Sequence, residues 1–508
     1  MKINILEYFL ETVKKYPTRM AVVEGEQQIS FAELQQRAVA LSHALVEKIN
    51  ILNQPIAVFL PKSINTVIAN TAITYSGNIY MNLDVKAPTE RINNILALIQ
   101  PVMFITTKTY FDTVKSVLPD SIKVCFVDDE YLFDEKQEEI LLKRLSQLID
   151  TDPYCIINTS GSTGTPKGVV LNHKSFFDFM EWSIETLKIG DCEIIGSLSP
   201  AVFDIYSHEL CMMMSKGSTI VLLPEHLSAF PIKILEILKK ENVSYIFWVP
   251  TIMVNIANMD LLSKIELPAL KTVWFAGEVL PTKQYNYWHK HLPVTKFVNL
   301  YGPIEITLDC VYYIVDREFD DSEPLPIGFA CRNTSLLILN ENNQTCKQGE
   351  EGELCIRGTS LAMGYYNNWE KTSVAFTQNP LNTKYPEMIY RTGDIVLENE
   401  RGEIMFKGRR DTLVKHLGYR IELGEIEHVV VNTLKLVSNA CVIYQQQNKE
   451  IVLVYENDTE VSSADFRKQI GQILPKYMIP TKYIKVEKMP MNANGKIDRL
   501  KINQKINS

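Results

Sequence analysis

The chain has 508 residues, more than one hydrophobic core usually supports, which predicts at least two domains. Its formal net charge is −8 and its acidic and basic residues are interleaved, which argues against nucleic acid or an anionic membrane as a partner. No secretion signal is visible, and no stretch approaches the ~20 uncharged apolar residues of a membrane span. With nine scattered cysteines and no CxxC pair, we expect a reduced, cytoplasmic protein without membrane insertion.

The first predicted element is an amphipathic helix within residues 1–17, where charged residues interrupt the apolar ones. From about residue 20 to 400, short β-branched or aromatic runs alternate with helical patterns, which predicts α/β units around a largely parallel sheet. Clear runs stand at 55–60, 154–161, 218–223, 244–250 and 272–278. Open α/β sheets bind ligands beyond the carboxyl ends of their strands, so we expect the functional residues there.

The C-terminal part of the sequence has a different pattern. Helical patterns at 422–434 and 463–474 flank strand-like runs at 439–447 and 450–456, which predicts a compact α+β domain. We place the boundary at Arg410–Asp411. The fold class is therefore α/β, with a large N-terminal domain over residues 1–410 and a small C-terminal domain over 411–508.

The segment TSGSTGTPKGVV, residues 159–170, combines glycines, hydroxyl residues and one lysine. Glycine lets successive backbone N–H groups turn toward an anion, and hydroxyls and an ammonium add further donors, so a phosphate group is the natural ligand. The GxxxxGK[ST] motif fails here, because Pro166 stands five residues after Gly161 and Gly168 follows Lys167. The alternative is a glycine-rich surface turn.

Further motifs follow in a fixed order along the chain. They are FD at 203–204, GE at 277–278, NLYGPIEIT at 299–307, YRTGD at 390–394, GRRD at 408–411, GYRIELGEIE at 418–427 and NGKIDR at 494–499. Together with the glycine-rich segment, this series resembles the adenylate-forming superfamily, which includes acyl-CoA synthetases, firefly luciferase and the adenylation domains of nonribosomal peptide synthetases. The chain looks most like the amino-acid-activating branch, particularly free-standing enzymes such as D-alanine:D-alanyl carrier protein ligase.

The resemblance implies a two-step reaction. A carboxylate is joined to the α-phosphate of ATP with release of pyrophosphate, and the acyl group then passes from AMP to a thiol. Because two anions must meet, neutralising charge is most of the task. By resemblance, the β- and γ-phosphates of ATP are held by Thr159, Ser160, Gly161, Ser162, Thr163, Gly164 and Lys167.

The same resemblance implies a nucleotide site. Tyr301 would stack on the base, Asp394 would accept hydrogen bonds from the ribose, and Glu305 would be catalytic and hold Mg²⁺, a cation that prefers oxygen ligands. The full expected set is Gly277, Glu278, Asn299, Leu300, Tyr301, Gly302, Asp394, Phe406 and Arg409. Ile304 departs from the family, which usually has threonine there, so a hydroxyl contact to the α-phosphate is lost.

In the family, the small domain is mobile and carries a catalytic lysine, here Lys496, to the carboxylate and α-phosphate oxygens. For the second step this domain rotates about a hinge, matched by Asp411, and Gly418 would line a tunnel for a phosphopantetheine arm. Leu413 and Leu417 stand where the family usually has Gln and Arg-like residues. These changes put details of the thiol-transfer face in doubt.

In the amino-acid branch, the aspartate after phenylalanine binds the α-ammonium of the substrate, and Asp204 occupies that position. Motif spacing gives the other predicted pocket residues, which are Ile205, His208, Phe247, Trp274, Ala276, Leu300, Leu308 and Asp309. Ala276 replaces the cysteine typical of D-alanine ligases. Asp309 could pair with a second amino group or a hydroxyl, or point toward solvent. We expect a small or medium amino acid as substrate.

The leading prediction is an ATP- and Mg²⁺-dependent amino acid ligase that loads a separate phosphopantetheinylated carrier protein. The sequence shows no carrier-like GGxS segment and no condensation domain. One alternative is acyl-CoA synthesis, with free CoA as the thiol. Another is a non-catalytic module that binds nucleotide and amino acid, which Ile304, Leu413 and Leu417 favour and Lys496 and Glu305 oppose.

Overall fold

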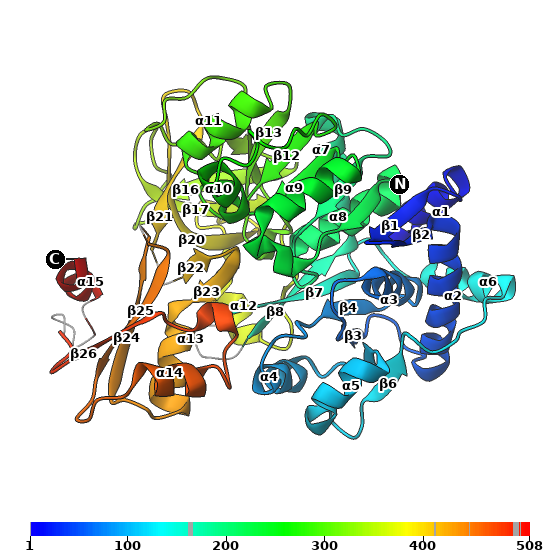
Figure 1. Ribbon diagram of the computed structural model, residues 1–508, viewed down its shortest axis with the longest axis horizontal. Coiled ribbons are helices and arrows are strands. Elements are labelled where there is room, and N and C mark those ends of the chain that lie inside the picture. Colours follow the sequence, from blue (N-terminus) through cyan, green and yellow to red (C-terminus); the bar gives the residue numbers. More distant parts are fainter. Residues whose placement is uncertain are drawn as a thin grey trace.

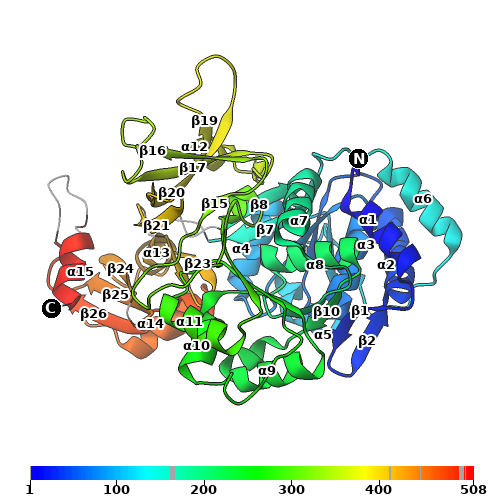
Figure 2. The same ribbon diagram turned by 90° about the horizontal axis from the view of Figure 1, so that it is seen from above.

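A computed structural model describes residues 2–160, 166–410, 413–446, 448–490, 497 and 499–507. It has a mixed α/β architecture with a large N-terminal domain and a small C-terminal domain, as the sequence predicts. The two domains lie side by side, and both views place the C-terminal elements at the opposite end of the molecule from the first helices (Figures 1 and 2). None of the described helices combines the length and apolarity needed to cross a membrane.

The first large sheet has the strand order β18-β8-β7-β4-β3-β5-β6. Its strands are β3 (Pro55–Val58), β4 (Ile79–Asn82), β5 (Met103–Thr106), β6 (Lys123–Phe126), β7 (Pro153–Thr159), β8 (Lys167–Asn172) and β18 (Gly364–Tyr365). The path from β7 to β6 is parallel, whereas β8 and β18 pair antiparallel. β3, β4 and β5 are buried along their whole length, because helices cover both faces of a parallel sheet.

The second large sheet has the order β15-β14-β13-β12-β11-β9-β10-β1-β2. Its strands are β1 (Met20–Glu24), β2 (Gln27–Ser30), β9 (Ile194–Ser197), β10 (Thr219–Leu222), β11 (Tyr245–Trp248), β12 (Thr272–Phe275), β13 (Lys296–Tyr301), β14 (Val311–Ile314) and β15 (Phe329–Ala330). The path from β13 through β12, β11, β9 and β10 to β1 is parallel. The carboxyl ends of these strands therefore meet at one edge of the sheet.

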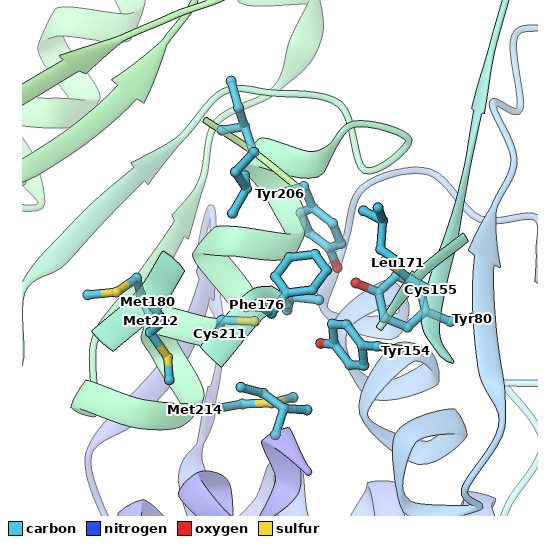
Figure 3. Packing of buried hydrophobic residues seen from close by; sticks show 14 of the residues in the cluster. Tyr80, Tyr154, Cys155, Leu171, Phe176, Met180, Tyr206, Cys211, Met212 and Met214 are labelled. Carbon is cyan, nitrogen blue, oxygen red and sulfur yellow. The ribbon is translucent and has the colours of Figure 1, made fainter. Parts of the chain in front are cut away.

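Helices fill the space between these two sheets and cover their outer faces. The inner helices are α1 (Ile5–Lys15), α2 (Phe31–Lys48), α3 (Ile64–Tyr75), α7 (His173–Leu187) and α8 (Asp204–Lys216), with α6 (Glu135–Leu145) beside them. Figure 3 shows this core, where Tyr80 and Tyr154 of the first sheet pack near Phe176 of α7 and Cys211 of α8. Outer cover comes from α4 (Thr89–Ile99), α5 (Lys108–Val114), α9 (Pro231–Lys240), α10 (Pro250–Asn258) and α11 (Thr282–His291).

A third, antiparallel sheet completes the large domain. It consists of β16 (Thr334–Leu339), β17 (Gly352–Gly358), β19 (Phe376–Gln378), β20 (Met388–Glu398) and β21 (Ile404–Arg409), with α12 (Trp369–Ala375) leading into β19. β20 lies between β17 on one side and β19 and β21 on the other. This long strand carries Asp394 toward the two large sheets.

The small domain begins with a hairpin, β22 (Leu413–His416) and β23 (Tyr419–Glu422). Its core sheet comprises β24 (Asn439–Gln445), β25 (Glu450–Glu456) and β26 (Lys482–Val486). α13 (Leu423–His428) and α14 (Ser463–Ile470) pack on one face of that sheet, and α15 (Arg499–Asn507) packs on the other. This is the predicted α+β arrangement. Asp411, the predicted hinge, lies outside the described residues, so the boundary at Arg410–Asp411 stays a prediction.

Candidate active site

A cavity of about 470 Å³ lies where the parallel strands of the second sheet end. Pro200 lies beyond β9, Val249 beyond β11, Ala276 beyond β12 and Gly302 beyond β13, and all four line it. The β22–β23 hairpin of the small domain forms the opposite wall. The functional residues therefore gather at the carboxyl edge of the sheet, as the sequence predicts.

Six of the predicted pocket residues line this cavity, namely Asp204, Ile205, Phe247, Ala276, Leu308 and Asp309. His208, Trp274 and Leu300 are buried behind that wall. His208 lies one helical turn beyond Asp204, and its ring stacks on Trp274 with centroids 5.4 Å apart. Its Nε2 is 3.2 Å from the hydroxyl of Tyr245. His208 and Trp274 thus support the pocket from behind. This position differs from the prediction that both side chains face the substrate.

Asp204 is the first residue of α8, where its Oδ1 accepts a hydrogen bond of 3.0 Å from the backbone N–H of Ile205. Burial raises the pKa of this carboxyl to about 6, and Lys415 partly opposes that rise. The walls beside it are apolar, formed by Ile205 and Phe247. A cation is therefore the ligand that this position would stabilise most.

Asp394 and Tyr301 lie side by side at the other end of the cavity. The carboxylate of Asp394 accepts hydrogen bonds from the Tyr301 hydroxyl and the Arg409 guanidinium. Phe406 packs near Tyr301 with ring centroids 6.4 Å apart, and Asn299 is held behind the wall by a 2.7 Å bond from its Nδ2 to the carbonyl of Pro326. Asp394, Arg409 and Phe406 thus form one connected group with Tyr301.

Glu305 lies in the short 3₁₀ turn Ile304–Ile306 and is fully buried. Its Oε1 accepts a 2.8 Å hydrogen bond from the Tyr365 hydroxyl, and its Oε2 accepts a 2.6 Å bond from the Arg420 guanidinium of the hairpin. Burial alone would raise the pKa of Glu305, but Arg420 and Lys167 hold it at about 2. This carboxylate is therefore ionised and available to a second cation only if Arg420 leaves.

The glycine-rich segment connects β7 to β8, where Thr159 pairs with Lys167. Ser160 donates a 2.8 Å hydrogen bond to the carbonyl of Arg420 and accepts one of 3.1 Å from the N–H of Glu422. The Thr159 hydroxyl is buried without a hydrogen-bond partner among the described residues. The predicted phosphate residues Gly161, Ser162, Thr163 and Gly164 lie outside the described residues.

Glu278 contacts the hairpin as well as its own domain. Its Oε2 accepts a 3.0 Å bond from the N–H of Thr251, and its Oε1 accepts a 2.8 Å bond from the N–H of Gly418. Gly418 has φ = +84°, and a Cβ there would lie 3.1 Å from the Val249 side chain. The backbone of Gly418 therefore lies close to the wall of the cavity, and its place in a tunnel stays a prediction.

Further contacts hold the small domain in the same position. Arg91 of α4 and Glu425 of α13 form a buried ion pair of 2.7 Å. The Tyr419 ring packs on Phe203 at 5.2 Å and stacks on Tyr477 at 3.7 Å. In this arrangement the hairpin fills the side of the cleft that faces the carboxylates.

Lys496 lies outside the described residues, whereas Met489, Ile497 and α15 are described. Met489 and Ile497 pack with α15 on the face of the small sheet opposite α13 and α14. Arg499 forms a 2.5 Å ion pair with Glu427. In both views α15 lies on the outer side of the small domain, away from the large one (Figures 1 and 2).

Sequence reasoning missed several charged groups at the site. Lys415 of β22 lines the cavity, where burial lowers its pKa although Asp394 and Asp309 oppose that shift. Lys62 donates bonds of 2.8 and 3.1 Å to the carbonyls of Ser197 and Ser199, which precede Asp204. No motif signals these residues, because their partners are far away in the sequence.

Comparisons with known proteins agree with the motifs. Residues 9–366 match the family model described as AMP-binding enzyme. Tyrocidine synthase 1 of Brevibacillus parabrevis is 31% identical over 498 residues, which span 98% of this chain and 44% of that protein. Zwittermicin A synthase ZmaJ of Bacillus cereus is 29% identical over 508 residues, covering 98% of this chain and 94% of that protein. This chain therefore spans less than half of some curated relatives and nearly all of another.

The solved structures give the same fold. The Vibrio cholerae adenylation domain AlmE, in complex with glycyl-adenosine-5′-phosphate, matches with a TM-score of 0.85. The match covers 100% of this chain and 98% of that one at 22% identity. At this identity the likeness establishes the arrangement of the elements, with a large N-terminal and a small C-terminal domain.

Proposed function

Because the chain belongs to the AMP-binding enzyme family, we propose that it activates an amino acid with ATP and passes the aminoacyl group to a carrier-protein thiol. In the first step a carboxylate oxygen of the amino acid bonds to the α-phosphorus of ATP, and the bond to the β-phosphate breaks, releasing pyrophosphate. In the second step a thiolate attacks the acyl carbon and AMP leaves. The observation that carries this proposal is one cavity lined by Asp204 and Asp394, with the buried Glu305 bonded to Arg420 of the cavity wall.

The nucleotide would occupy the end of the cavity around Tyr301. Tyr301 offers an aromatic face, and Asp394 offers paired oxygen acceptors for ribose hydroxyls. The orphaned hydroxyl of Thr159 at the start of the glycine-rich segment fits a phosphate oxygen, because a buried hydroxyl without a partner is costly. Lys167, at the other end of that segment, would add positive charge.

Glu305 is the residue that would hold Mg²⁺. Mg²⁺ in nucleotide sites usually binds one or two carboxylates together with phosphate oxygens and water, so a single ionised carboxylate fits. Lys167, which also lowers the pKa of Glu305, belongs to the large domain and would still favour the charged carboxylate after Arg420 has left. Bound there, the metal ion would neutralise phosphate charge, and Glu305 would orient it within the cleft.

The amino acid would bind with its α-ammonium against Asp204. This carboxylate sits at the cavity wall among apolar neighbours, which favours a substrate cation over an uncharged acid. Phe247 and Ala276 would bound the side chain of the substrate. This preference for a cationic group is what separates an amino acid ligase from an acyl-CoA synthetase in our proposal.

The two steps require two positions of the small domain. With the hairpin in the cleft, Arg420 pairs with Glu305, and Gly418 lies at the wall that a thiol arm would follow. We assign this arrangement to thiol transfer. For adenylation the small domain turns about Asp411 and presents Lys496 to the α-phosphate, so that residues 1–410 and 411–508 move as separate domains.

The thiol acceptor that we propose is a phosphopantetheine arm on a separate carrier protein. The Bacillus cereus relative is matched over 94% of its own length, so it contains little beyond the matched segment. Free CoA as acceptor would instead indicate an acyl-CoA synthetase. A module that only binds its ligands would give neither step.

Amino-acid-dependent exchange of labelled pyrophosphate into ATP tests the proposal. We expect exchange with at least one amino acid among all D and L forms, and none with fatty or aryl acids. The Asp204→Ala variant should lose this exchange, whereas the control Asp321→Ala, on the exposed surface, should keep it. Exchange only with acids that lack an amino group would contradict the role of Asp204, and silence with every acid would favour the binding module.

A further inference from the structure

A second carboxylate, Asp309, faces the same cavity as Asp204. Its side chain is 4% exposed and lines the cavity. None of the described residues donates a hydrogen bond to this side chain, although buried carboxylates normally accept several. The wall around it is apolar and includes Ile205, Phe247 and Leu308. The Asp309 carboxylate therefore lacks a hydrogen-bond donor, and a ligand in the cavity could provide one.

The backbone that leads to Asp309 is held in an unfavourable conformation. Thr307 has φ = +54° and Leu308 has φ = +66°, a left-handed region that costs energy for any residue with a Cβ and most for a β-branched one. Gly302 permits the turn, because a Cβ there would lie 2.1 Å from the carbonyl oxygen of Leu308. Strain of this kind collects at functional sites, and here it directs Asp309 into the cavity.

The charges around Asp309 indicate which ligand would complete the site. Burial raises the pKa of Asp309 well above its ordinary value, and the nearby Asp204 raises it further. The cation that lowers the pKa of both aspartates is Lys415 of the hairpin. Neither aspartate forms an ion pair with Lys415 or with any other described residue, so both positions are open to a cation that a ligand brings.

The substrate must supply the cation that Asp309 lacks. The proposed function places one substrate ammonium at Asp204, which leaves Asp309 without a cation against an apolar wall. A hydroxyl group would neutralise neither carboxylate, and an alkyl group would leave Asp309 unpaired. A second ammonium would remove both the repulsion between the aspartates and the missing hydrogen bonds.

We propose that the amino acid activated by this chain carries a second amine on its side chain, and that Asp309 binds this amine and sets the specificity. This inference rests on the proposed function. It places a diamino acid across the cavity, with its α-ammonium at Asp204, its side-chain ammonium at Asp309 and its carboxylate toward the nucleotide end.

Pyrophosphate exchange with pairs of matched amino acids tests the inference. The cationic members are 2,3-diaminopropionate, 2,4-diaminobutyrate, ornithine and lysine, and the neutral members are 2-aminobutyrate, norvaline, norleucine, serine and homoserine. We expect one diamino acid to exceed every neutral one in kcat/KM by about 100-fold or more, because the analogue without the amine leaves a buried group unpaired. A neutral or hydroxylated amino acid at or above the diamino acids would overturn the inference.

The Asp309→Asn variant separates specificity from structure. It should lower kcat/KM for the diamino acid by about 100-fold while sparing or improving exchange with its neutral counterpart, a reversal that simple destabilisation would not give. Equal loss on both substrates, or no loss on either, would contradict the role of Asp309. The control Asp321→Asn should keep the original preference.

A binding measurement keeps the test independent of turnover. Sulfamoyl-adenosine analogues of 2,4-diaminobutyrate and 2-aminobutyrate differ in the second amine. Calorimetry on the full chain should show about 100-fold tighter binding of the diamino analogue, and Asp309→Asn should remove that difference. Exchange with neutral amino acids that Asp309→Asn does not change would refute this inference and leave the proposed function standing. Silence with every amino acid, together with no binding of either analogue, would refute both.

Discussion

The cavity wall of the large domain and the hairpin of the small domain carry opposite charges. They also differ in whether those charges depend on domain docking. The wall carries anions whose partners belong to the same domain, such as Asp394 with Tyr301 and Glu305 with Tyr365. The hairpin carries the cations Lys415 and Arg420, which reach the cavity only through the docking of the small domain. The large domain therefore fixes the acceptors, and the position of the small domain decides which cation faces them.

This difference explains why the contacts between the domains are specific. Glu278 receives the backbone N–H of Gly418, Ser160 bonds to the backbone of β23, and Arg91 pairs with Glu425. Hydrogen bonds to backbone groups depend on the position of the hairpin more than on its side chains. They would break together if the small domain turned as we propose.

The largest expected effect comes from removing the cation that we assign to the first step. Lys496→Ala should slow amino-acid-dependent pyrophosphate exchange by about 10³-fold, because an ammonium at the transferring phosphate stabilises charge in the transition state. Transfer from a supplied aminoacyl adenylate should persist. The control Lys488→Ala, an exposed lysine of the same domain, should keep both steps. Equal loss of both steps would contradict domain exchange.

A smaller effect is expected when Asp204, which we propose binds the substrate ammonium, loses its charge. Asp204→Asn should reduce kcat/KM for the amino acid by about 100-fold, since its ammonium loses its counter-charge. For the wild-type chain, KM for the amino acid should rise as the pH falls through about 6, the raised pKa of Asp204, because the protonated carboxyl loses its charge. A KM that stays flat between pH 7 and 5 would argue against this assignment.

The same pKa predicts the effect of Asp204 on stability. A carboxyl whose folded pKa is raised costs the folded state free energy as the pH rises from its ordinary value to about 6 and above. Asp204→Asn should therefore leave the melting temperature at pH 7 unchanged or higher, while it removes activity. A clear drop in melting temperature would indicate a structural role instead.

Gly418 tests the hairpin with a matched control. Gly418→Ala places a Cβ at φ = +84°, about 3.1 Å from Val249, and should slow thiol transfer by about tenfold with pyrophosphate exchange retained. Gly349 has a similar φ of +82° with nothing within 4 Å of a Cβ. Gly349→Ala carries the same backbone strain and should leave both steps unchanged. Equal effects of the two variants would mean that strain, not the approach to Val249, matters.

The substitution that we expect to affect the reaction least lies inside the large domain. Its main effect is on stability. Lys62 bonds to Ser197 and Ser199, and burial lowers its pKa, whereas burial raises the pKa of Glu209 close by. Lys62→Met should lower the free energy of unfolding by about 3 kcal/mol, because it removes the cation whose charge favours the buried Glu209 carboxylate. Adding Glu209→Met should recover much of that loss in a denaturant titration. No recovery would show that the pair is not coupled.

The fold was largely predictable because its strands are marked locally. The runs at 55–60, 244–250 and 272–278 became β3, β11 and β12, since β-branched and aromatic residues buried on both faces have few alternatives. On helix α8, the sequence predicted which residues line the cavity only over the first turn. Asp204 lines it, but His208 on the same helix lies behind it, because the cavity ends above that turn.

The charges from the small domain could not be predicted. Arg420 pairs with Glu305, and Arg91 with Glu425, across 115 and 334 residues. Such contacts depend on how two separately folded units dock, which local sequence does not encode. The strained turn at Thr307 and Leu308 was equally hidden, because neither residue type favours a positive φ.

The most direct test of the account is to hold the hairpin in the cleft. Arg91→Cys and Glu425→Cys can be joined by a cleavable bis-maleimide across the buried ion pair that now connects α4 and α13. We predict that the joined chain loses pyrophosphate exchange, still accepts a supplied aminoacyl adenylate for thiol transfer, and regains exchange when the linker is cleaved. Full pyrophosphate exchange in the joined chain would contradict the claim that the small domain must bring a different cation to the fixed anions.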